Sequence, residues 1–414
     1  MANPDLPVFL SRSRARPRVA GVQHDDALEQ LEMVATRAGT PALRGFEAAG
    51  LLQQAHILRL KGELEAAEVA ARRAAESYEG LGDVEGQALA LLALGEVLSD
   101  RAKFHEFEAV VRKAMALALL ARSPRVRARA RVLLGAAAIY QGKPADARDE
   151  IVEAVETCRR SGDRQGLARS LLLLGRIDHM EGRLREAAGS VRTAAALFEE
   201  LGESRSMVTA LFSLGQMDFE RGDLEDARRS AERGLCLAHR TEDAVMQLRC
   251  LLLRSQVDVE AGRAATALAT MRQAEAISCH EVVASILPEI CRVRAQALME
   301  NGDAVAAEGS ASRGIQTAEP DDFYSQGTTR LARALALDAQ GRTAEAEADF
   351  LQALERLEQA NEVYERGWGH LAYGQFLLSD GRSGIARDHL TRAREAFASL
   401  ENQEKLALID SLNS

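Results

Sequence analysis

Two apolar patterns within residues 165–202 define the unit from which the chain is built. In the first, Leu171 and Ile177 belong to a series of apolar residues spaced three and four apart, and in the second Val191 and Phe198 belong to another. This spacing places apolar side chains in a stripe along one side of an α-helix. The segment is therefore expected to form two amphipathic helices that pack antiparallel through their apolar sides.

A glycine separates the two predicted helices. Glycine is favoured at a helix end because it adopts the left-handed conformation without steric cost. The corresponding turn residues recur with a period of about 40 residues, which identifies an internal repeat. In chain order they are Gly62, Ala102, Gly142, Gly182, Gly222, Gly262, Gly302, Gly341 and Gly381. The repeat therefore extends through almost the whole chain.

Small residues recur at three positions of each repeat, one in the first helix and two in the second. In the unit of residues 165–202 they are Gly175, Ala187 and Ala194. The first-helix column reads Ala55, Gly95, Gly135, Gly175, Gly215, Ser255, Ala295, Ala334 and Gly374. Small side chains let two helix backbones approach closely, so these columns predict tight pairing within each unit.

The repeat resembles the tetratricopeptide repeat (TPR). Gly175, Gly182, Ala187 and Ala194 have the residue types and spacings of the TPR packing positions. Because the period exceeds the usual value of about 34 residues, the units are similar to the longer ones of kinesin light chains and of bacterial activators of the maltose-regulon type. The resemblance implies an all-α fold, a right-handed α-solenoid of about nine helix–turn–helix units with helical caps.

The pattern divides the chain into four parts. Residues 1–24 form an arginine-rich tail expected to be disordered, residues 25–40 an N-terminal capping helix, residues 41–403 the TPR-like solenoid and residues 404–414 a C-terminal capping helix. Caps are expected because the end units of a solenoid would otherwise expose apolar side chains. The tail is also compatible with a mitochondrial transit peptide, but the arginine bias of the whole chain favours a bacterial tail.

The second unit departs from the pattern. Ala102 replaces the turn glycine, and Phe107 replaces the first small residue of the second helix. A larger side chain at a close helix contact costs about 1 to 3 kcal/mol unless neighbours adjust. We therefore expect the two helices of this unit to lie further apart and the solenoid curvature to change near Phe107.

Composition narrows the functional classes. The net charge of −10 argues against nucleic-acid binding by the body of the chain, since such proteins are usually basic on one face. The five cysteines show neither a disulfide framework nor zinc-site spacing, and the apolar runs are too short to span a membrane. These features predict a cytoplasmic protein with no cofactor, no metal site and no catalytic residues.

The TPR resemblance implies that the first helices line a concave groove, where protein or peptide partners lie. Polar and aromatic residues at groove-facing offsets are the candidate partner-binding residues. They are Arg129, Arg169, Arg176, His179, Phe212, Gln216, Phe219, Glu220, Arg249, Gln256, Glu260 and Gln296. The alternative for any one of them is a solvated helix face with i,i+4 pairs, each worth a few tenths of a kcal/mol.

Charged residues also occupy two columns that TPR proteins usually fill with apolar groups. Asp178, Asp218 and Asp258 share one offset, while Arg254 and Arg294 share another with Arg333. Buried ionised groups must be paired. We therefore expect a structural ladder in which Asp258 pairs with Arg254 on its own helix or with Arg294 of the next unit.

Two functions are consistent with these observations. The first is a non-enzymatic TPR scaffold or adaptor that binds a protein or peptide segment in the groove. The alternative is a regulatory sensor that binds a small molecule or signalling peptide and transmits the change to a partner. A closed pocket near Phe212, Phe219 and Arg249 favours the sensor, and an open groove favours the scaffold. The sequence leaves the oligomeric state and the identity of the partner open.

Overall fold

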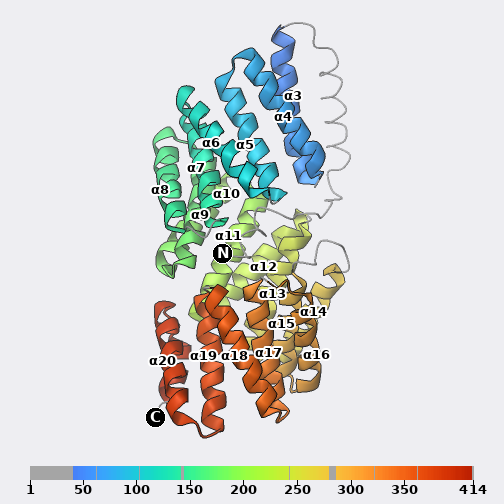
Figure 1. Ribbon diagram of the computed structural model, residues 1–414, viewed down its shortest axis with the longest axis vertical. Helices are drawn as coiled ribbons and strands as arrows, with labels where there is room; N and C mark the ends of the chain where they lie inside the picture. Colours follow the sequence, from blue (N-terminus) through green and yellow to red (C-terminus); the bar gives the residue numbers. More distant parts are fainter. Residues whose placement is uncertain are drawn as a thin grey trace. The chain divides into compact units, whose positions relative to one another are not determined.

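The computed structural model describes residues 41–412 except positions 62, 102, 141–143, 242, 279–285, 321 and 361. The predicted tail (1–24) and N-terminal capping helix (25–40) lie outside the described residues. All regular secondary structure within the described part is α-helical (Figure 1). The expectation of an all-α solenoid is confirmed.

Helices α3 to α20 follow one another as nine helix–turn–helix repeats, and α21 ends the described chain. The first helix of each repeat carries an odd number. In order, the helices are α3 (Pro41–Lys61), α4 (Leu64–Leu81), α5 (Val84–Asp100), α6 (Phe104–Leu120), α7 (Pro124–Tyr140), α8 (Pro144–Ser161), α9 (Arg164–Met180), α10 (Leu184–Leu201), α11 (Ser204–Arg221), α12 (Leu224–Arg240), α13 (Ala244–Glu260), α14 (Ala264–Ser278), α15 (Leu287–Glu300), α16 (Ala304–Thr317), α17 (Phe323–Ala339), α18 (Thr343–Ala360), α19 (Val363–Ser379), α20 (Ser383–Ser399) and α21 (Gln403–Leu412).

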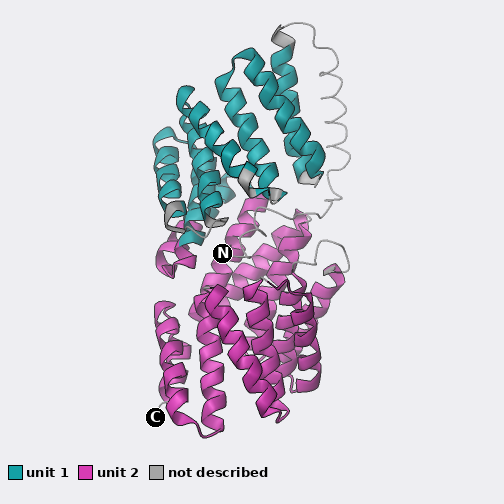
Figure 2. Cartoon of the chain, viewed as in Figure 1, with its two compact units in different colours: residues 1–177, 193–203 teal, residues 178–192, 204–414 magenta. Residues whose placement is uncertain are grey.

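The chain folds as two compact units, shown in different colours in Figure 2. Unit 1 comprises Met1–Ile177 and Thr193–Glu203, and unit 2 comprises Asp178–Arg192 and Ser204–Ser414. Helices α9 and α10 therefore contribute to both. Within each unit, successive helices pack on one another as the repeat pattern predicts, for example α7 on α8 in unit 1 and α17 on α18 in unit 2.

The turn glycines adopt the conformation that the repeat predicts. Gly182 has a φ of 76°, in the left-handed region. Its amide donates to the His179 carbonyl at 2.9 Å, and the Arg183 amide donates to the Asp178 carbonyl at 2.8 Å. These bonds satisfy carbonyl groups at the end of α9 that have no partner within the helix. The other described turn glycines of this column share the positive φ, namely Gly222, Gly262, Gly302, Gly341 and Gly381.

The small first-helix column marks close helix contacts, as predicted. A Cβ atom added to Gly135 would lie 2.7 Å from Ile151 Cδ1 on the following helix. One added to Gly374 would lie 2.9 Å from Leu390 Cδ2. Neither distance leaves room for a methyl group, so glycine sets the spacing of these helix pairs.

Phe107 fits into the second repeat without being exposed. Its side chain is fully buried, with 0% exposure. It lies against Gly95, where an added Cβ atom would be 3.6 Å from the ring. The missing side chain at Gly95 supplies part of the space that the phenylalanine needs. The wider helix spacing and altered curvature remain predictions, and Ala102 lies outside the described residues.

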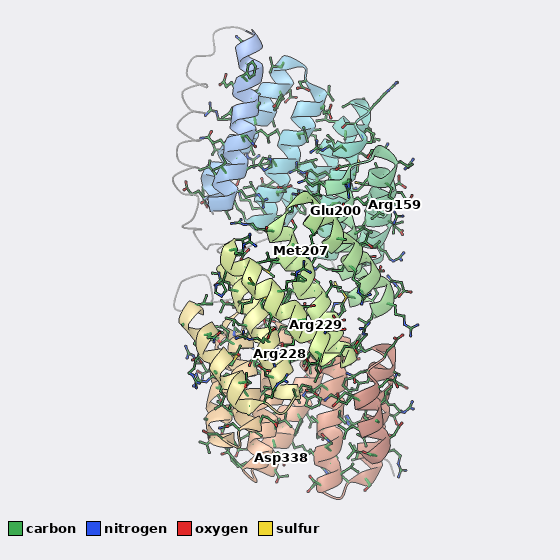
Figure 3. All side chains as sticks on the ribbon, turned by 180° about the vertical axis from the view of Figure 1, so that it is seen from behind. Arg159, Glu200, Met207, Arg228, Arg229 and Asp338 are labelled. Atoms are coloured by element: carbon green, nitrogen blue, oxygen red, sulfur yellow. The ribbon has the colours of Figure 1, made fainter. Side chains whose placement is uncertain are left out.

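Asp258 is buried and paired, as the predicted charge ladder requires, but the predicted partners of Asp258 are wrong. Asp258 is 0% exposed and accepts from Arg228 Nη1 at 2.8 Å and from Arg263 Nε at 3.0 Å. Arg228 lies on α12, where Figure 3 labels it. The predicted partners turn elsewhere, because Arg254 donates to Thr270 at 3.2 Å and Arg294 pairs with Glu275 at 2.7 Å. Arg254 thus contacts the second helix of its own repeat and Arg294 the second helix of the preceding repeat, while Asp258 pairs with one arginine of α12 and one at the following turn.

Unit 2 contains a pair of partly or fully buried histidines in direct contact. His370 on α19 and His389 on α20 place their Nδ1 atoms 2.9 Å apart. Burial, the neighbouring His389, and the charges of Arg392 and Arg366 lower the pKa of His370 to about 4. Burial and Arg392 also lower the pKa of His389. Both rings are therefore neutral in the folded protein at neutral pH.

We expect the folded state to lose stability as the pH falls from about 6.5 to about 4. In this window the unfolded chain binds protons that the folded histidines do not, so acid favours unfolding, by about 2 kcal/mol after allowing for solvent screening. The measurement is the melting temperature at pH 7.5 and pH 5.0. His370→Gln should show a smaller drop than the native chain, and His239→Gln, at an exposed position on α12, should show the native drop. An equal drop in all three would contradict the assignment.

Candidate functional site

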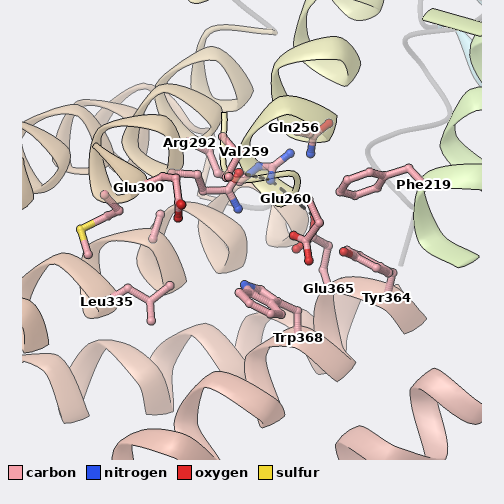
Figure 4. A pocket seen from close by; sticks show the side chains of 14 residues that line it. Phe219, Gln256, Val259, Glu260, Arg292, Glu300, Leu335, Tyr364, Glu365 and Trp368 are labelled. Atoms are coloured by element: carbon pink, nitrogen blue, oxygen red, sulfur yellow. Dashed lines mark hydrogen bonds and ion pairs between the residues drawn. The ribbon is translucent and has the colours of Figure 1, made fainter. Parts of the chain in front are cut away.

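A cavity of about 430 Å³ lies in unit 2 among the first helices of five successive repeats. Each of these helices, α11, α13, α15, α17 and α19, contributes side chains to its wall (Figure 4). The lining residues are Phe219, Gln256, Val259, Glu260, Gly262, Arg292, Gln296, Met299, Glu300, Ala332, Leu335, Tyr364, Glu365 and Trp368. Second helices contribute none of them, so the cavity belongs to one side of the repeat array.

Arg292 is the main buried charge of the cavity wall, with 1% of its surface exposed. With the Gln256 amide oriented so that its oxygen faces the guanidinium, that oxygen accepts from Nη2 at 2.8 Å and from Nη1 at 3.2 Å. Nη1 also lies 3.3 Å from the Gln296 side-chain oxygen and 3.6 Å from a Glu365 carboxylate oxygen. The Nε atom has no hydrogen-bond partner among the residues that the structure describes.

Glu365 and two tyrosines surround this guanidinium. Burial raises the pKa of Glu365, while the charge of Arg292 opposes that rise. Burial also raises the pKa of Tyr364 well above its ordinary value. Although burial works against the charge on Arg292, Tyr324 and Glu365 raise its pKa further. The cavity therefore holds a permanently charged guanidinium beside a carboxyl group that ionises less readily than usual.

Aromatic rings form the other part of the wall. The ring centroids of Phe219 and Tyr364 lie 5.5 Å apart, and those of Tyr364 and Phe397 lie 5.8 Å apart. Figure 4 shows Trp368 and Tyr364 on the opposite side of the cavity from Gln256 and Arg292. Aromatic faces bind apolar groups and cations, so the cavity offers both kinds of surface together with hydrogen-bonding groups.

Four of the residues predicted from the sequence line this cavity: Phe219, Gln256, Glu260 and Gln296. Their offsets in the repeat place them on consecutive first helices, which is why they come together. The structure thus gathers one third of the predicted set at one site, and their role in binding remains a proposal.

Other predicted residues of unit 2 form pairs of their own. The His179 ring nitrogen Nε2 lies 2.7 Å from a Glu220 carboxylate oxygen. The Arg249 guanidinium carbon lies 5.7 Å from the centroid of the Phe212 ring, which is 5% exposed. Gln216 is half-buried on α11. None of these five lines the 430 Å³ cavity.

The remaining predicted residues are arginines of unit 1. Arg129 Nη2 lies 2.5 Å from Glu96, and the carboxylate of Glu96 also pairs with Arg59 at 3.2 Å. Burial alone would raise the pKa of Glu96, but the two arginines lower it to about 2. Arg169 lies 3.7 Å from Glu203, and Arg176 is half-buried on α9. None of these three arginines lines the cavity of unit 2.

Sequence reasoning missed Arg292, Tyr364, Glu365 and Trp368. One signal was present for Arg292, because its column is otherwise apolar or aromatic: Leu92, Val132, Leu172, Phe212, Leu252, Leu331 and Leu371. An arginine at such a position must be buried with a partner. For Trp368 the signal was its position, because it occupies the same column of the repeat as the predicted groove residues Arg129, Arg169 and Arg249. No comparable signal distinguished Tyr364 or Glu365.

No preformed metal centre is present among the described residues. They contain no group of three or more His, Cys, Asp or Glu side chains arranged to hold a metal ion. Burial raises the pKa of Cys158 to about 11 and that of Cys250 to about 12, so both remain thiols at neutral pH. No helix in the described part has the length and apolar character needed to cross a membrane.

Comparison with solved structures shows the same fold in several other proteins. A Rap protein complexed with Competence and Sporulation Factor is 15% identical with a TM-score of 0.65, over 87% of this chain and 99% of that chain. The apo form of the quorum sensor NprR from B. thuringiensis is 13% identical with a TM-score of 0.62, over 84% and 98%. The Rap conjugation gene regulator of the plasmid pLS20, in complex with the Phr* peptide, is 13% identical with a TM-score of 0.57, over 79% and 94%.

Sequence comparison identifies the family. A search of curated protein sequences finds no match. The family model of the MalT-like TPR region matches residues 101–368, which is more than half of the 414-residue chain. The matched range covers most of unit 2, part of unit 1 and every cavity-lining residue. The chain therefore belongs to the family of MalT-like TPR regions.

Proposed function

We propose that this chain is a non-enzymatic regulatory scaffold that binds a peptide or an extended protein segment in the cavity of unit 2. The observation that carries the proposal is the convergence of five successive first helices on one cavity with a buried, incompletely bonded guanidinium. A buried donor without a partner is costly in a folded protein. A ligand carbonyl or carboxylate that accepted from Arg292 would remove this cost.

The structural neighbours support the same proposal. Two Rap structures contain Competence and Sporulation Factor and the Phr* peptide, respectively, and NprR is described as a quorum sensor. At 13–15% identity these proteins share the fold with this chain. The choice of a peptide as the ligand therefore depends on the chemistry of the cavity, which combines aromatic faces with amide, carboxylate and guanidinium groups.

A sensor that binds a small molecule is the second candidate. Its supporting observation is the size of the cavity, since about 430 Å³ lies within the range of small-ligand pockets, about 300–1,000 Å³. The cavity lies beside Phe219 but does not include Phe212 or Arg249, so it meets only part of the condition that favours a sensor. Either ligand would bridge several repeats and thereby change their spacing.

The test is capture of ligands from a bacterial lysate on the immobilised full-length chain, followed by mass spectrometry. The best-retained compound is then titrated calorimetrically into the native chain, Leu335→Trp and Leu351→Trp. Leu335 lines the cavity, so the added indole should fill it and raise the Kd at least about tenfold, or about 1.4 kcal/mol. Leu351 is 52% exposed on α18 and serves as the matched control with native affinity.

Two outcomes would count against the proposed site. Equal affinity of Leu335→Trp and the native chain would place the ligand outside the cavity. Loss of ligand binding in an Arg169→Glu, Arg249→Glu variant, with native affinity in Leu335→Trp, would assign binding to Arg169 and Arg249. A retained small molecule in place of a peptide would favour the sensor.

A further inference from the structure

Lys405 on the C-terminal helix α21 places its ammonium group at the edge of the cavity. The ammonium forms an ion pair with Glu260 on α13 and lies 4.8 Å from the centroid of the Trp368 ring on α19. Glu260 and Trp368 both line the cavity, whereas Lys405 comes from the end of the chain. The Lys405 side chain is 9% exposed. Two residues of the cavity wall therefore already contact an ammonium group that the chain itself supplies.

Helix α21 packs on α20, and its contacts with other helices of unit 2 are mainly polar. Lys405 and Ile409 are the two buried residues of this ten-residue helix. In the turn before it, the Asn402 side-chain amide donates to the Glu220 carbonyl at 2.9 Å, and Glu401 pairs with Arg185 at 2.8 Å. The Arg185–Glu401 pair is exposed, and such ion pairs contribute little stability and weaken with salt. The Lys405–Glu260 pair is buried, so its lysine can be exchanged only for another cation, because an unpaired buried charge is costly.

The charge of the cavity favours a cation at this position. Glu260 pairs with Lys405, and Glu365 lies beside Arg292. Glu300 also lines the cavity, and within the described residues it forms no ion pair. Without Lys405, two carboxylates and the face of Trp368 would be left for a cation. An ammonium or guanidinium group binds such a site by charge-assisted hydrogen bonds and by attraction to the ring.

We propose that Lys405 is a displaceable internal ligand: a ligand with a primary ammonium or guanidinium group takes its place between Glu260 and Trp368, and this exchange releases α21. The inference rests on the proposed binding function of the cavity and specifies both the ligand chemistry and the element that responds. An internal competitor lowers the apparent affinity of the ligand by the fraction of molecules in which the site is occupied. Removing the Lys405 ammonium should therefore strengthen binding of small cations.

The single tryptophan of the chain, Trp368, reports directly on this site. The experiment titrates n-butylammonium chloride into the full-length chain while tryptophan fluorescence is recorded at pH 7.5 and constant ionic strength. The variants are Lys405→Met, which keeps the length of the side chain, and Glu404→Gln, a change at an exposed neighbouring position. Sodium butyrate and n-butanol are the anionic and neutral probes.

We expect Lys405→Met to bind butylammonium at least about fivefold more tightly than the native chain and than Glu404→Gln. Adding Glu260→Gln to Lys405→Met should weaken binding about fivefold, because the carboxylate is lost. Butyrate and butanol should give no saturable signal. Equal affinity of Lys405→Met and the native chain, or equal responses to all three probes, would overturn the proposal.

A second measurement addresses release of the helix in the unmodified protein. Backbone amides of α21 should exchange with deuterium faster in the presence of butylammonium than in matched sodium chloride, while those of α17 should not change. Unchanged exchange in α21 would overturn the release step.

The two proposals can fail separately. If Leu335→Trp weakens binding of the captured ligand and Lys405→Met leaves its affinity unchanged, the binding function of the cavity stands and the exchange at Lys405 is contradicted. If butylammonium binds beside Trp368 but Leu335→Trp weakens binding of no captured ligand, the cation site stands and the proposed binding function of the cavity is contradicted.

Discussion

Replacing Arg292 with alanine is expected to lower the free energy of unfolding of unit 2 by about 3–5 kcal/mol, the usual cost of breaking a buried ion pair by removing one partner. Arg292 on α15 is 1% exposed. Its loss would leave Glu365, which is 8% exposed, without the opposing charge 3.6 Å away. It would also leave the Gln256 amide oxygen without its donor.

The measurement is urea unfolding followed by the fluorescence of Trp368, which lies in the same unit. Arg294→Ala is the matched control two residues away on α15. Its side chain is 45% exposed and pairs with Glu275 at 2.7 Å, so its removal should cost at most about 1 kcal/mol. A loss below about 1 kcal/mol for Arg292→Ala would show that the network around Glu365 does not depend on the guanidinium.

A third variant separates stability from binding. Arg292→Met replaces the charge with an apolar side chain of similar length, as the neighbouring repeats have at this column. Such replacements of buried charges are often neutral or stabilising. We expect Arg292→Met to recover much of the stability lost in the alanine variant while still binding the captured ligand more weakly than the native chain. This result would show that the buried charge of Arg292 contributes to ligand binding and not to stability.

The fold could be predicted because the determinants of each repeat are local. Each repeat of about 40 residues contains its own apolar stripes, a turn residue and a small first-helix residue; Gly182 and Gly135 are examples from two repeats. Each repeat has the same pattern of residues, so the period can be recognised even where one repeat departs from the pattern. Phe107 illustrates the tolerance, since Gly95 on the facing helix provides space for its ring.

The site could be predicted only in part because it depends on contacts between repeats. Constant offsets selected Phe219, Gln256 and Gln296 for the groove, and these residues do line one cavity. The offsets could not show that α21 returns to Glu260, a contact that spans 145 residues along the chain. Nor could they choose the partner of Asp258, because arginines on several helices lie within reach of a central aspartate.

Phe350→Ala tests how far one repeat can adjust to a lost side chain, and we expect a loss of about 3–4 kcal/mol in the stability of unit 2. Phe350 is 0% exposed on α18, and its ring centroid lies 5.4 Å from that of Tyr373 and 5.2 Å from that of Phe376. The same column of other repeats holds alanine at Ala231 and Ala311, both fully buried. The column therefore accepts alanine wherever the facing helices are close enough.

At Phe350 the facing helix cannot close onto the smaller side chain, because Tyr373 and Phe376 keep α19 at the distance that the ring requires. Tyr373 is also held by a hydrogen bond of 2.9 Å from its hydroxyl to Glu347. A cavity should therefore remain, and its cost adds to that of the lost apolar contacts. The measurement is urea unfolding, with Leu351→Ala, 52% exposed on the same helix, as the control that should change stability by less than about 1 kcal/mol. A loss below about 1.5 kcal/mol for Phe350→Ala would mean that α18 and α19 do move together, and that the spacing of these repeats is adjustable enough for a ligand between the first helices to change it.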